Sequence, residues 1–274
     1  MAEQYYTTPE MVVIETSKYI QDGMTIFVGI GLGLLTASFA IRNHAPNATV
    51  VMEGGTVDSK FAHFPFSVCE PRSAYGCSLI TGLTDILGYS VGGRKVNMAV
   101  LGAAQVDQFG NLNSTMGPRE TGKPFDVLHP GWRATGSGGA NDSASAVPFV
   151  LNIVHEKRRF PEYVDYLTSP GWKVKQFKNN GEFDWVPRER AGLIHGGPVA
   201  IVTTQCIMKF DDKTKVAYLS EYFPGTSPEE IKKTIDWDID ISKAVQTKPP
   251  TREEIRILRE EVDPEGILLG SLRK

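Results

Sequence analysis

The chain has 274 residues, with 29 Lys or Arg and 32 Asp or Glu, which gives a formal net charge of −3. This length is sufficient for a large α/β domain, so the fold needs neither disulfides nor structural metals to bury a core. This small negative net charge excludes a strong electrostatic attraction to nucleic acid or to an anionic membrane. Three cysteines without a CxxC motif, and a first segment without a basic stretch, predict a cytoplasmic protein with reduced thiols.

Apolar patterning in the first third of the chain predicts a strand, a turn, a helix and a second strand. Residues 24–40 form the longest apolar stretch, but three glycines interrupt it. A buried strand at 24–28, a glycine turn and a helix at 34–43 explain this stretch better than a membrane span. A further strand is expected at 48–52. This order favours parallel strands joined by a right-handed crossover.

Three helix starts are indicated by their capping residues. Thr8 as N-cap, followed by Pro9 and Glu10, predicts the first helix. The segments 227–230 and 251–254 each place a Glu three residues after a Ser or Thr, which is the spacing of a capping box. Two helices are therefore expected to close the chain.

The remaining strands are predicted by composition. Strands at 206–210 and 216–219 flank a polar turn and indicate a hairpin. There is no repeat and no clear linker, so a single domain over residues 1–274 is expected. The predicted fold class is α/β, with an open, mostly parallel sheet, flanking helices, and a small hairpin and helices toward the C-terminus. The other buried strands are expected at 96–101, 147–154 and 199–203.

Glu53 is the strongest candidate for catalysis. It follows an apolar strand and precedes Gly54 and Gly55. In open α/β sheets, ligands bind beyond the carboxyl ends of the strands. A carboxylate is ionised at pH 7, so it can act as a nucleophile without a general base, and the two glycines would leave room for a bulky substrate. A solvated Glu at the end of a strand is the alternative.

Two glycine-rich turns could present backbone N–H groups to a ligand. In the segment 136–139, the N–H groups of Gly138 and Gly139 would suit an oxyanion or a phosphate. Gly29 and Gly31 follow a strand and precede a helix, but the spacing of the next glycines does not fit the dinucleotide fingerprint. For the segment 136–139 the alternative is a conformationally demanding loop, and for Gly29 and Gly31 it is tight packing of the strand against the helix.

Gln105 and the histidines complete the candidate residues. Gln105 follows the strand at 96–101 and could donate a hydrogen bond into a nearby site, although the next residues are typical of a structural turn. The five histidines show no metal-ligand spacing, so no metal site is expected.

Taken together, these segments resemble the β subunit of glutaconate CoA-transferase, a class I CoA-transferase. The resemblance extends from Thr8 to Pro264. Two segments look longer than in the family pattern, at 117–131 and 172–190, and Gly54 stands where that pattern has Ser. The matching segments are 51–55, 102–107, 110–115, 135–141, 155–160, 168–172 and 219–228.

The resemblance implies a fold, a reaction and a partner. The fold would be the open sheet of CoA-transferases, and Glu53 would be the nucleophile that attacks an acyl-CoA in a ping-pong mechanism with a glutamyl-CoA thioester. Coenzyme A would be a substrate, and a separate α subunit would complete a heteromer. For the oxyanions of this reaction, the candidates from the local sequence are the N–H groups of Gly138 and Gly139, and for substrate and CoA binding they are Gly29, Gly31 and Gln105.

Alternative functions exist within the same superfamily and outside enzymes. A ring-cleaving hydrolase or a decarboxylase would act on a CoA ester without transferring CoA, and access of water decides between transfer and hydrolysis. A non-catalytic subunit that only completes a catalytic α chain is the third alternative. The presence of Glu53 favours transfer over all of these.

Overall fold

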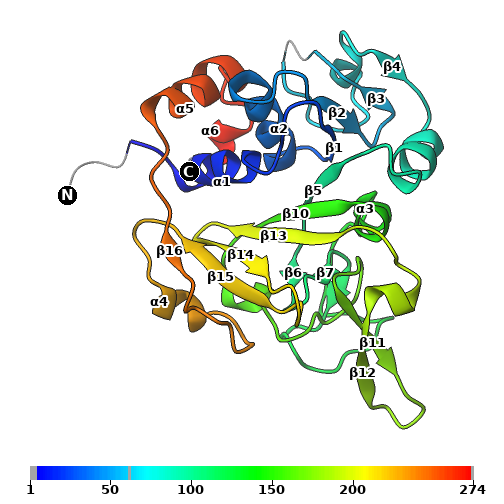
Figure 1. Ribbon diagram of the computed structural model, residues 1–274. Coiled ribbons are helices and arrows are strands. Elements are labelled where there is room, and N and C mark those ends of the chain that lie inside the picture. The colour runs from blue at the N-terminus through cyan, green and yellow to red at the C-terminus, as the bar shows by residue number, and fades with distance from the viewer. Residues whose placement is uncertain (1–4, 61–62, 273–274) are drawn as a thin grey trace. The chain divides into compact units, whose positions relative to one another are not determined.

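In the computed structural model the chain forms two compact units (Figure 1). The structure describes residues 5–60 and 63–272. The first unit comprises the residues up to Leu101 together with those from Lys248 onward, and the second comprises Gly102 to Thr247. The last part of the chain therefore returns to the first unit. The single domain expected over residues 1–274 stays a prediction.

The first unit combines a sheet with helices. Strand β1 pairs in parallel with both β2 and β5, and β3 and β4 extend the sheet by antiparallel pairing, in the order β5-β1-β2-β3-β4. The strands are β1 Thr25–Val28, β2 Thr49–Met52, β3 Thr56–Val57, β4 Leu79–Ile80 and β5 Met98–Gly102. The helices are α1 Thr8–Ser17, α2 Leu32–Asn43, η1 Pro71–Ala74, η2 Asp85–Gly92, α5 Arg252–Arg256, η5 Ile257–Val262 and α6 Leu269–Leu272.

Helix α1 begins one residue before the predicted position. Thr7 is the N-cap, and its N–H donates to Glu10 at 2.7 Å, so the predicted N-cap Thr8 is instead the first helical residue. The Glu10 side chain is fully buried, and Arg259 of η5 donates to its two oxygens at 2.7 and 2.9 Å. Burial raises the pKa of Glu10, but the Arg259 and Thr7 hydrogen bonds outweigh it and hold this pKa below its ordinary value.

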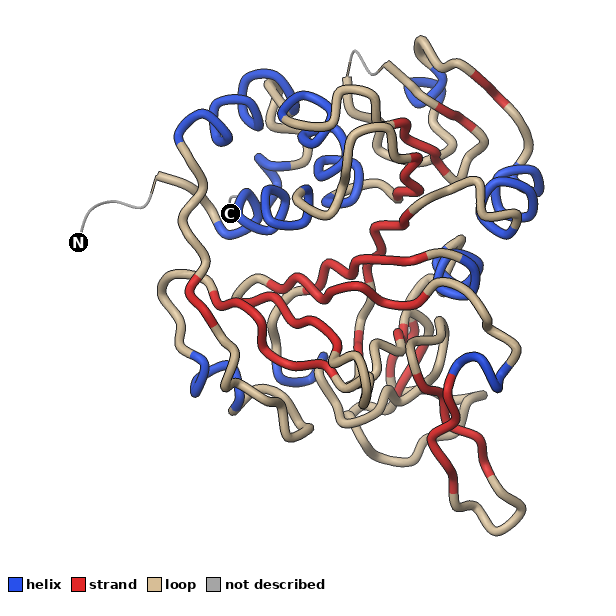
Figure 2. The backbone as a smooth tube through the Cα atoms, in the orientation of Figure 1, coloured by secondary structure: helices blue, strands red, loops and turns tan. Residues whose placement is uncertain are grey.

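Helix α2 begins at Leu32, two residues before the expected start, so Gly33 belongs to the helix and not to the turn. Leu34, Leu35 and Phe39 are fully buried. The residues from Leu34 to Ala40 are all buried, so this part of α2 is covered on every side and not along one face. Helices α1, α2, α5 and α6 group together with η5 in the first unit (Figure 2).

The second unit contributes five sheet strands, in the order β16-β15-β14-β13-β10. Strands β10 and β13 pair in parallel, as do β15 and β16, whereas β14 runs antiparallel to both of its neighbours. The β14–β15 hairpin is as predicted, and the α/β class with a mostly parallel sheet and flanking helices is confirmed. The strands are β10 Pro148–Ile153, β13 Gly197–Thr203, β14 Cys206–Phe210, β15 Ala217–Tyr222 and β16 Val245–Gln246.

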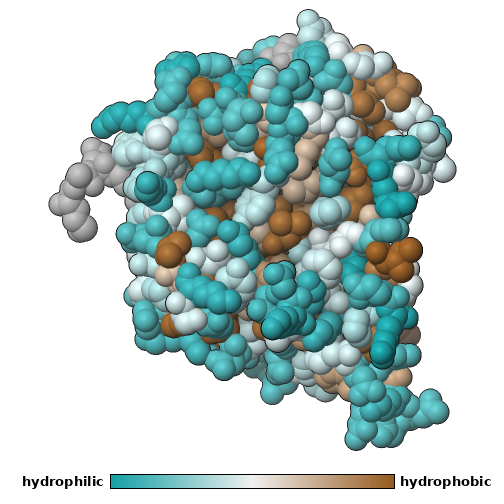
Figure 3. Space-filling model, in the orientation of Figure 1, coloured by the Kyte–Doolittle hydropathy of each residue, from teal (hydrophilic) through white to brown (hydrophobic). Residues whose placement is uncertain are grey.

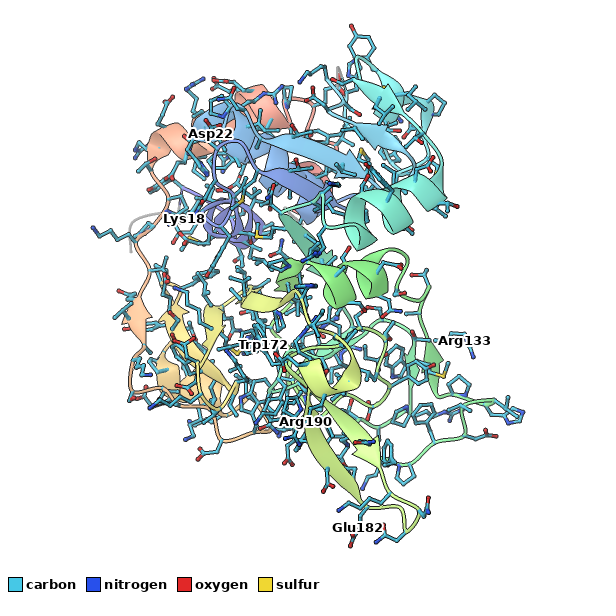
Figure 4. The ribbon with its side chains drawn as sticks, turned by 45° about the vertical axis from the view of Figure 1, so that its right-hand side comes forward. Lys18, Asp22, Arg133, Trp172, Glu182 and Arg190 are labelled. Carbon is cyan, nitrogen blue, oxygen red and sulfur yellow. The ribbon has the colours of Figure 1, made fainter. Side chains whose placement is uncertain are left out.

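Three short antiparallel pairs complete the second unit. They join β6 to β7, β8 to β9, and β11 to β12. The last pair forms a hairpin within the long segment 172–190, with Glu182 near its tip (Figure 4). The strands are β6 Gln105–Val106, β7 Leu112–Asn113, β8 Met116–Gly117, β9 Trp132–Arg133, β11 Lys173–Phe177 and β12 Phe183–Pro187. The helices are α3 Ala140–Ala146, η3 Lys157–Arg159, η4 Arg188–Ala191 and α4 Pro228–Lys232.

The two predicted capping segments both start helices. Thr251 and Glu254 form a complete capping box at α5, and Ser227 accepts the N–H of Glu230 at 3.3 Å at α4. Within the described residues, no helix is both long enough and apolar enough to cross a membrane.

The buried Glu10–Arg259 pair generates a stability prediction. Arg259→Met leaves a buried carboxylate without its cation, so we expect a loss of about 3 kcal/mol of unfolding free energy. Since the folded-state pKa of Glu10 is lowered, the pair contributes stability above the unfolded pKa and loses it as the pH falls through the folded pKa. Urea unfolding at pH 7 and at lower pH measures both effects.

A matched control is available on the same helical segment. Among the described residues, Arg256 pairs only with exposed carboxylates, so Arg256→Met should change the unfolding free energy by at most about 1 kcal/mol. Equal losses in the two variants would contradict a special role of the buried pair.

Candidate functional site

The parallel pairing of β1 and β2 fixes the edge at which the candidate residues lie. Val28 pairs with Met52 at the carboxyl ends of these strands. The residues that follow are Gly29 after β1 and Glu53 after β2. Because parallel strands end at the same edge of a sheet, the glycine turn and the carboxylate are neighbours at this edge.

The Glu53 side chain is available for chemistry. It is half-buried, and no hydrogen bond or ion pair to its carboxylate is found among residues 5–60 and 63–272. The preceding residues of β2, Val51 and Met52, are buried, and a hydrogen bond of 3.1 Å from the Gly55 N–H to the Met52 carbonyl closes the turn. The strand therefore fixes the backbone of Glu53 while its oxygens stay unpaired, as a nucleophile requires.

Gly54 and Gly55 have a different role from the one predicted. A Cβ on Gly54 would lie 2.0 Å from the Val68 carbonyl oxygen, and one on Gly55 would lie 2.0 Å from the Thr81 carbonyl oxygen. The space beside these glycines is thus filled by the protein's own backbone, not left open for a substrate. Gly55 also has φ +107°, which L side chains rarely adopt.

Gly29 and Gly31, by contrast, face open space. A Cβ built on either residue has no heavy atom within 4 Å, and Gly31, at φ +90°, is the N-cap of α2. The first N–H groups of a helix have no acceptor inside the helix, and the helix dipole makes this end partially positive. The turn at the same edge as Glu53 can therefore accept a negatively charged group.

The second glycine-rich turn lies in the second unit and leads into α3. The Gly136 N–H donates to the Ser114 carbonyl at 3.0 Å, and the Ala140 N–H donates to the Ser137 carbonyl at 3.1 Å. In the part of the chain that the structure describes, the N–H groups of Gly138 and Gly139 have no acceptor. These two donors remain candidates for stabilising an oxyanion.

Gln105 lies on β6, with only 3% of its side chain exposed. Its Nε2 donates to Asp165 Oδ2 at 2.6 Å, and its Oε1 accepts from Asn113 Nδ2 at 2.8 Å. An amide with both ends already paired has little capacity left for a ligand, so this geometry favours a positioning role. The expected contact of Gln105 with substrate or CoA stays a prediction.

The residues after Gln105 form a structural turn, which was the alternative to a ligand-binding role in the sequence analysis. Gly110 adopts φ +75°, and its N–H donates to the Asp107 carbonyl at 2.9 Å. The Asp107 carboxylate is buried and accepts the N–H groups of Phe109 and Asn111. Burial is the largest influence and raises the pKa of Asp107 to about 7.

The candidates thus divide between the two units. The first unit brings Glu53, Gly29 and Gly31 to one edge of its sheet, and the second unit holds Gln105, Gly138 and Gly139.

Sequence reasoning missed Arg188, whose side chain is 1% exposed. No local pattern distinguishes it from the exposed Arg190 two residues later. Across the described ranges, no group of three His, Cys, Asp or Glu side chains is placed to hold a metal ion.

The contact between Gly54 and Val68 generates a prediction. Gly54→Ala forces a Cβ into the Val68 backbone, so we expect a loss of about 1–3 kcal/mol of unfolding free energy. A displacement of the adjoining Glu53 should also lower kcat by roughly tenfold or more. Thermal unfolding and steady-state kinetics measure the two effects.

Gly88→Ala is the matched control, because a Cβ on Gly88 meets no atom within 4 Å. If Gly54→Ala behaves like this control, the close approach of Val68 does not constrain the turn.

Comparison with known proteins identifies the family. Residues 10–234 match the model of the Coenzyme A transferase family. The chain is 39% identical, over 94% of its length and 93% of the relative, to the B subunit of glutaconate CoA-transferase from Acidaminococcus fermentans. It is 30% identical, over 93% and 92%, to the B subunit of 3-oxoadipate CoA-transferase from Pseudomonas knackmussii.

A solved structure agrees with these sequence matches. The crystal structure of glutaconate coenzyme A-transferase from Acidaminococcus fermentans superposes with a TM-score of 0.84 at 36% identity, covering 97% of this chain and 98% of that chain. The resemblance inferred from the sequence motifs is confirmed, and the chain belongs to the Coenzyme A transferase family.

Proposed function

We propose that this chain is the β subunit of a cytoplasmic, heteromeric acyl-CoA:carboxylate CoA-transferase that carries CoA on Glu53 as a glutamyl thioester. One observation carries the proposal: the half-buried, unpaired carboxylate of Glu53 at the carboxyl end of β2. Its position at the edge of a parallel sheet is where α/β enzymes bind their ligands.

The reaction begins with attack by a Glu53 oxygen on the carbonyl carbon of an acyl-CoA. The C–S bond breaks and leaves an acyl-glutamyl anhydride and a CoA thiolate. The thiolate then attacks the glutamyl carbonyl, releases the first carboxylate and forms the glutamyl-CoA thioester. An acceptor carboxylate repeats the two steps in reverse and departs as the new acyl-CoA, leaving Glu53 free.

Each attack places negative charge on a carbonyl oxygen, and this oxyanion needs hydrogen-bond donors. The free N–H groups of Gly138 and Gly139 support their assignment as such donors, which typically contribute about 10²–10³-fold to the rate. Gly29 and Gly31 meet no other atoms and support an approach of substrate or CoA beside Glu53. Gln105, held by Asp165 and Asn113, is assigned a supporting role.

A separate α subunit is the proposed partner, since the relatives at 39% and 30% identity are both named as B subunits of CoA-transferases. Exposed apolar side chains support a protein partner, because soluble monomers rarely expose many of them together. Leu79 and Ile80 of β4 are 53% and 65% exposed, and brown, apolar atoms appear in the region of β4 in Figure 3. Residues 66–89, the segment that contains β4, expose four more large side chains: Phe66, Tyr75, Leu83 and Tyr89.

The proposal predicts that Glu53→Gln abolishes transfer. A neutral amide cannot form the anhydride, so we expect kcat to fall by at least about 10⁴-fold, a loss typical of removing a covalent nucleophile. CoA transfer from a panel of acyl-CoAs to carboxylates, assayed with the α subunit co-expressed, measures the loss. The wild type should give parallel lines in double-reciprocal plots, as a ping-pong mechanism requires.

Glu229→Gln removes an exposed carboxylate of α4 and should leave the rate unchanged. Retained transfer in Glu53→Gln would reject Glu53 as the nucleophile. Release of free CoA without any transfer in the wild type would instead indicate a hydrolase.

A further inference from the structure

Arg188 is a buried cation that is held by carbonyl oxygens. Its side chain is 1% exposed and begins the short helix η4. Across residues 5–60 and 63–272, no carboxylate lies within ion-pair distance of its guanidinium. The guanidinium donates instead to the carbonyl oxygens of Ala144 at 2.8 Å, Gly171 at 3.0 Å, Leu193 at 3.2 Å, Ser145 at 3.3 Å and His195.

A buried charge is unfavourable unless its hydrogen bonds are satisfied. Burial lowers the pKa of Arg188 below its ordinary value, but the five carbonyls engage all three nitrogens of the planar guanidinium. Such an arrangement fixes the positions of all the segments that provide the carbonyls. Three chain segments are thereby held at one point: the end of α3, the residue before Trp172, and the turn that precedes β13.

Helix α3 depends on this anchor because its other contacts are weak. It has seven residues, about two turns, and helices this short are not stable on their own. Its buried side chains are Ala140, Ser143 and Ala144, which are small and contribute little apolar area against β10 and β13. The guanidinium contacts the last carbonyls of α3, where a cation also stabilises the helix dipole.

The opposite end of α3 carries the candidate oxyanion donors. Gly139 is its N-cap, and Gly138 precedes it with φ +52°. On the side of the glycine turn, the Gly136 N–H provides a backbone anchor, through Ser114. A helix of seven residues is about 10 Å long and moves as a rigid body, so a shift at its last turn moves Gly138 and Gly139 as well.

We propose that Arg188 is a positioning residue for the reaction: by holding the carboxyl end of α3, it sets the direction of the Gly138 and Gly139 N–H groups. This inference rests on the proposed function, in which these two groups stabilise the oxyanion. Arg188 itself contacts neither substrate nor Glu53 in this assignment. Its effect should therefore appear in the chemical step and not in the binding of substrate.

Arg188→Lys in the assembled enzyme tests the inference. Lysine keeps the charge but loses the planar fork, so it cannot reach all the carbonyls together. Since a misplacement of about 1 Å costs roughly 10²-fold in rate, we expect kcat to fall about 10–100-fold while KM changes less than about threefold. Amide hydrogen exchange over residues 138–146 should become faster in the same variant.

Arg190→Lys is the matched control, on the same short helix but exposed (Figure 4). It should change neither kcat nor exchange over residues 138–146. If Arg188→Lys does not fold, Arg188→Gln replaces it, because the side-chain amide keeps N–H donors for some of these carbonyls but loses the planar fork.

A folded Arg188 variant with a lowered melting temperature but an unchanged kcat per active site would overturn the inference. Active sites are counted by the CoA bound covalently to the protein. An absence of bound CoA in the wild type would refute the proposed function instead, so the two failures are distinguishable.

Discussion

The parallel register of β1 and β2 is the constraint on which the candidate site depends. Val28 and Met52 pair at the ends of these strands, so the chain turns at the same edge after each of them. A glycine turn and a carboxylate follow at that edge. Val51 and Met52 point to opposite faces of the sheet and are both buried, so β2 is covered on both faces up to the residue before Glu53.

Rigid supports surround the groups assigned to catalysis. The turn after Glu53 is enclosed by the backbone of Val68 and Thr81, and α3 is held at its end by Arg188. Catalysis by preorganised donors requires such supports, because a donor that must reorient during the reaction loses its electrostatic advantage.

Features set by neighbours along the chain were predictable. The strand that precedes Glu53, the hairpin of β14 and β15, and the capping box at Thr251 follow from local patterns. Errors of one or two residues arose where local signals are degenerate. Two adjacent threonines precede Pro9, so either could cap α1, and Gly33 is tolerated within α2 although it reads as a turn residue.

Features set by distant residues could not be predicted. Gln105 is paired with Asp165, 60 residues away, so its saturation is invisible in its own segment. The space beside Gly54 is filled by Val68, and a sequence cannot distinguish a glycine that admits a substrate from one that admits backbone. Arg188 reads as one charge among several until the fold brings five carbonyls to it.

The most direct test of the account is mass spectrometry of the peptide that contains Glu53. The chain, assembled with its α subunit, is incubated with acyl-CoA and treated with hydroxylamine or borohydride, which convert a glutamyl thioester to a hydroxamate or an alcohol. The account predicts that the modification appears on Glu53 only after acyl-CoA is added. Consumption of the acyl-CoA with Glu53 unmodified under both treatments would contradict it.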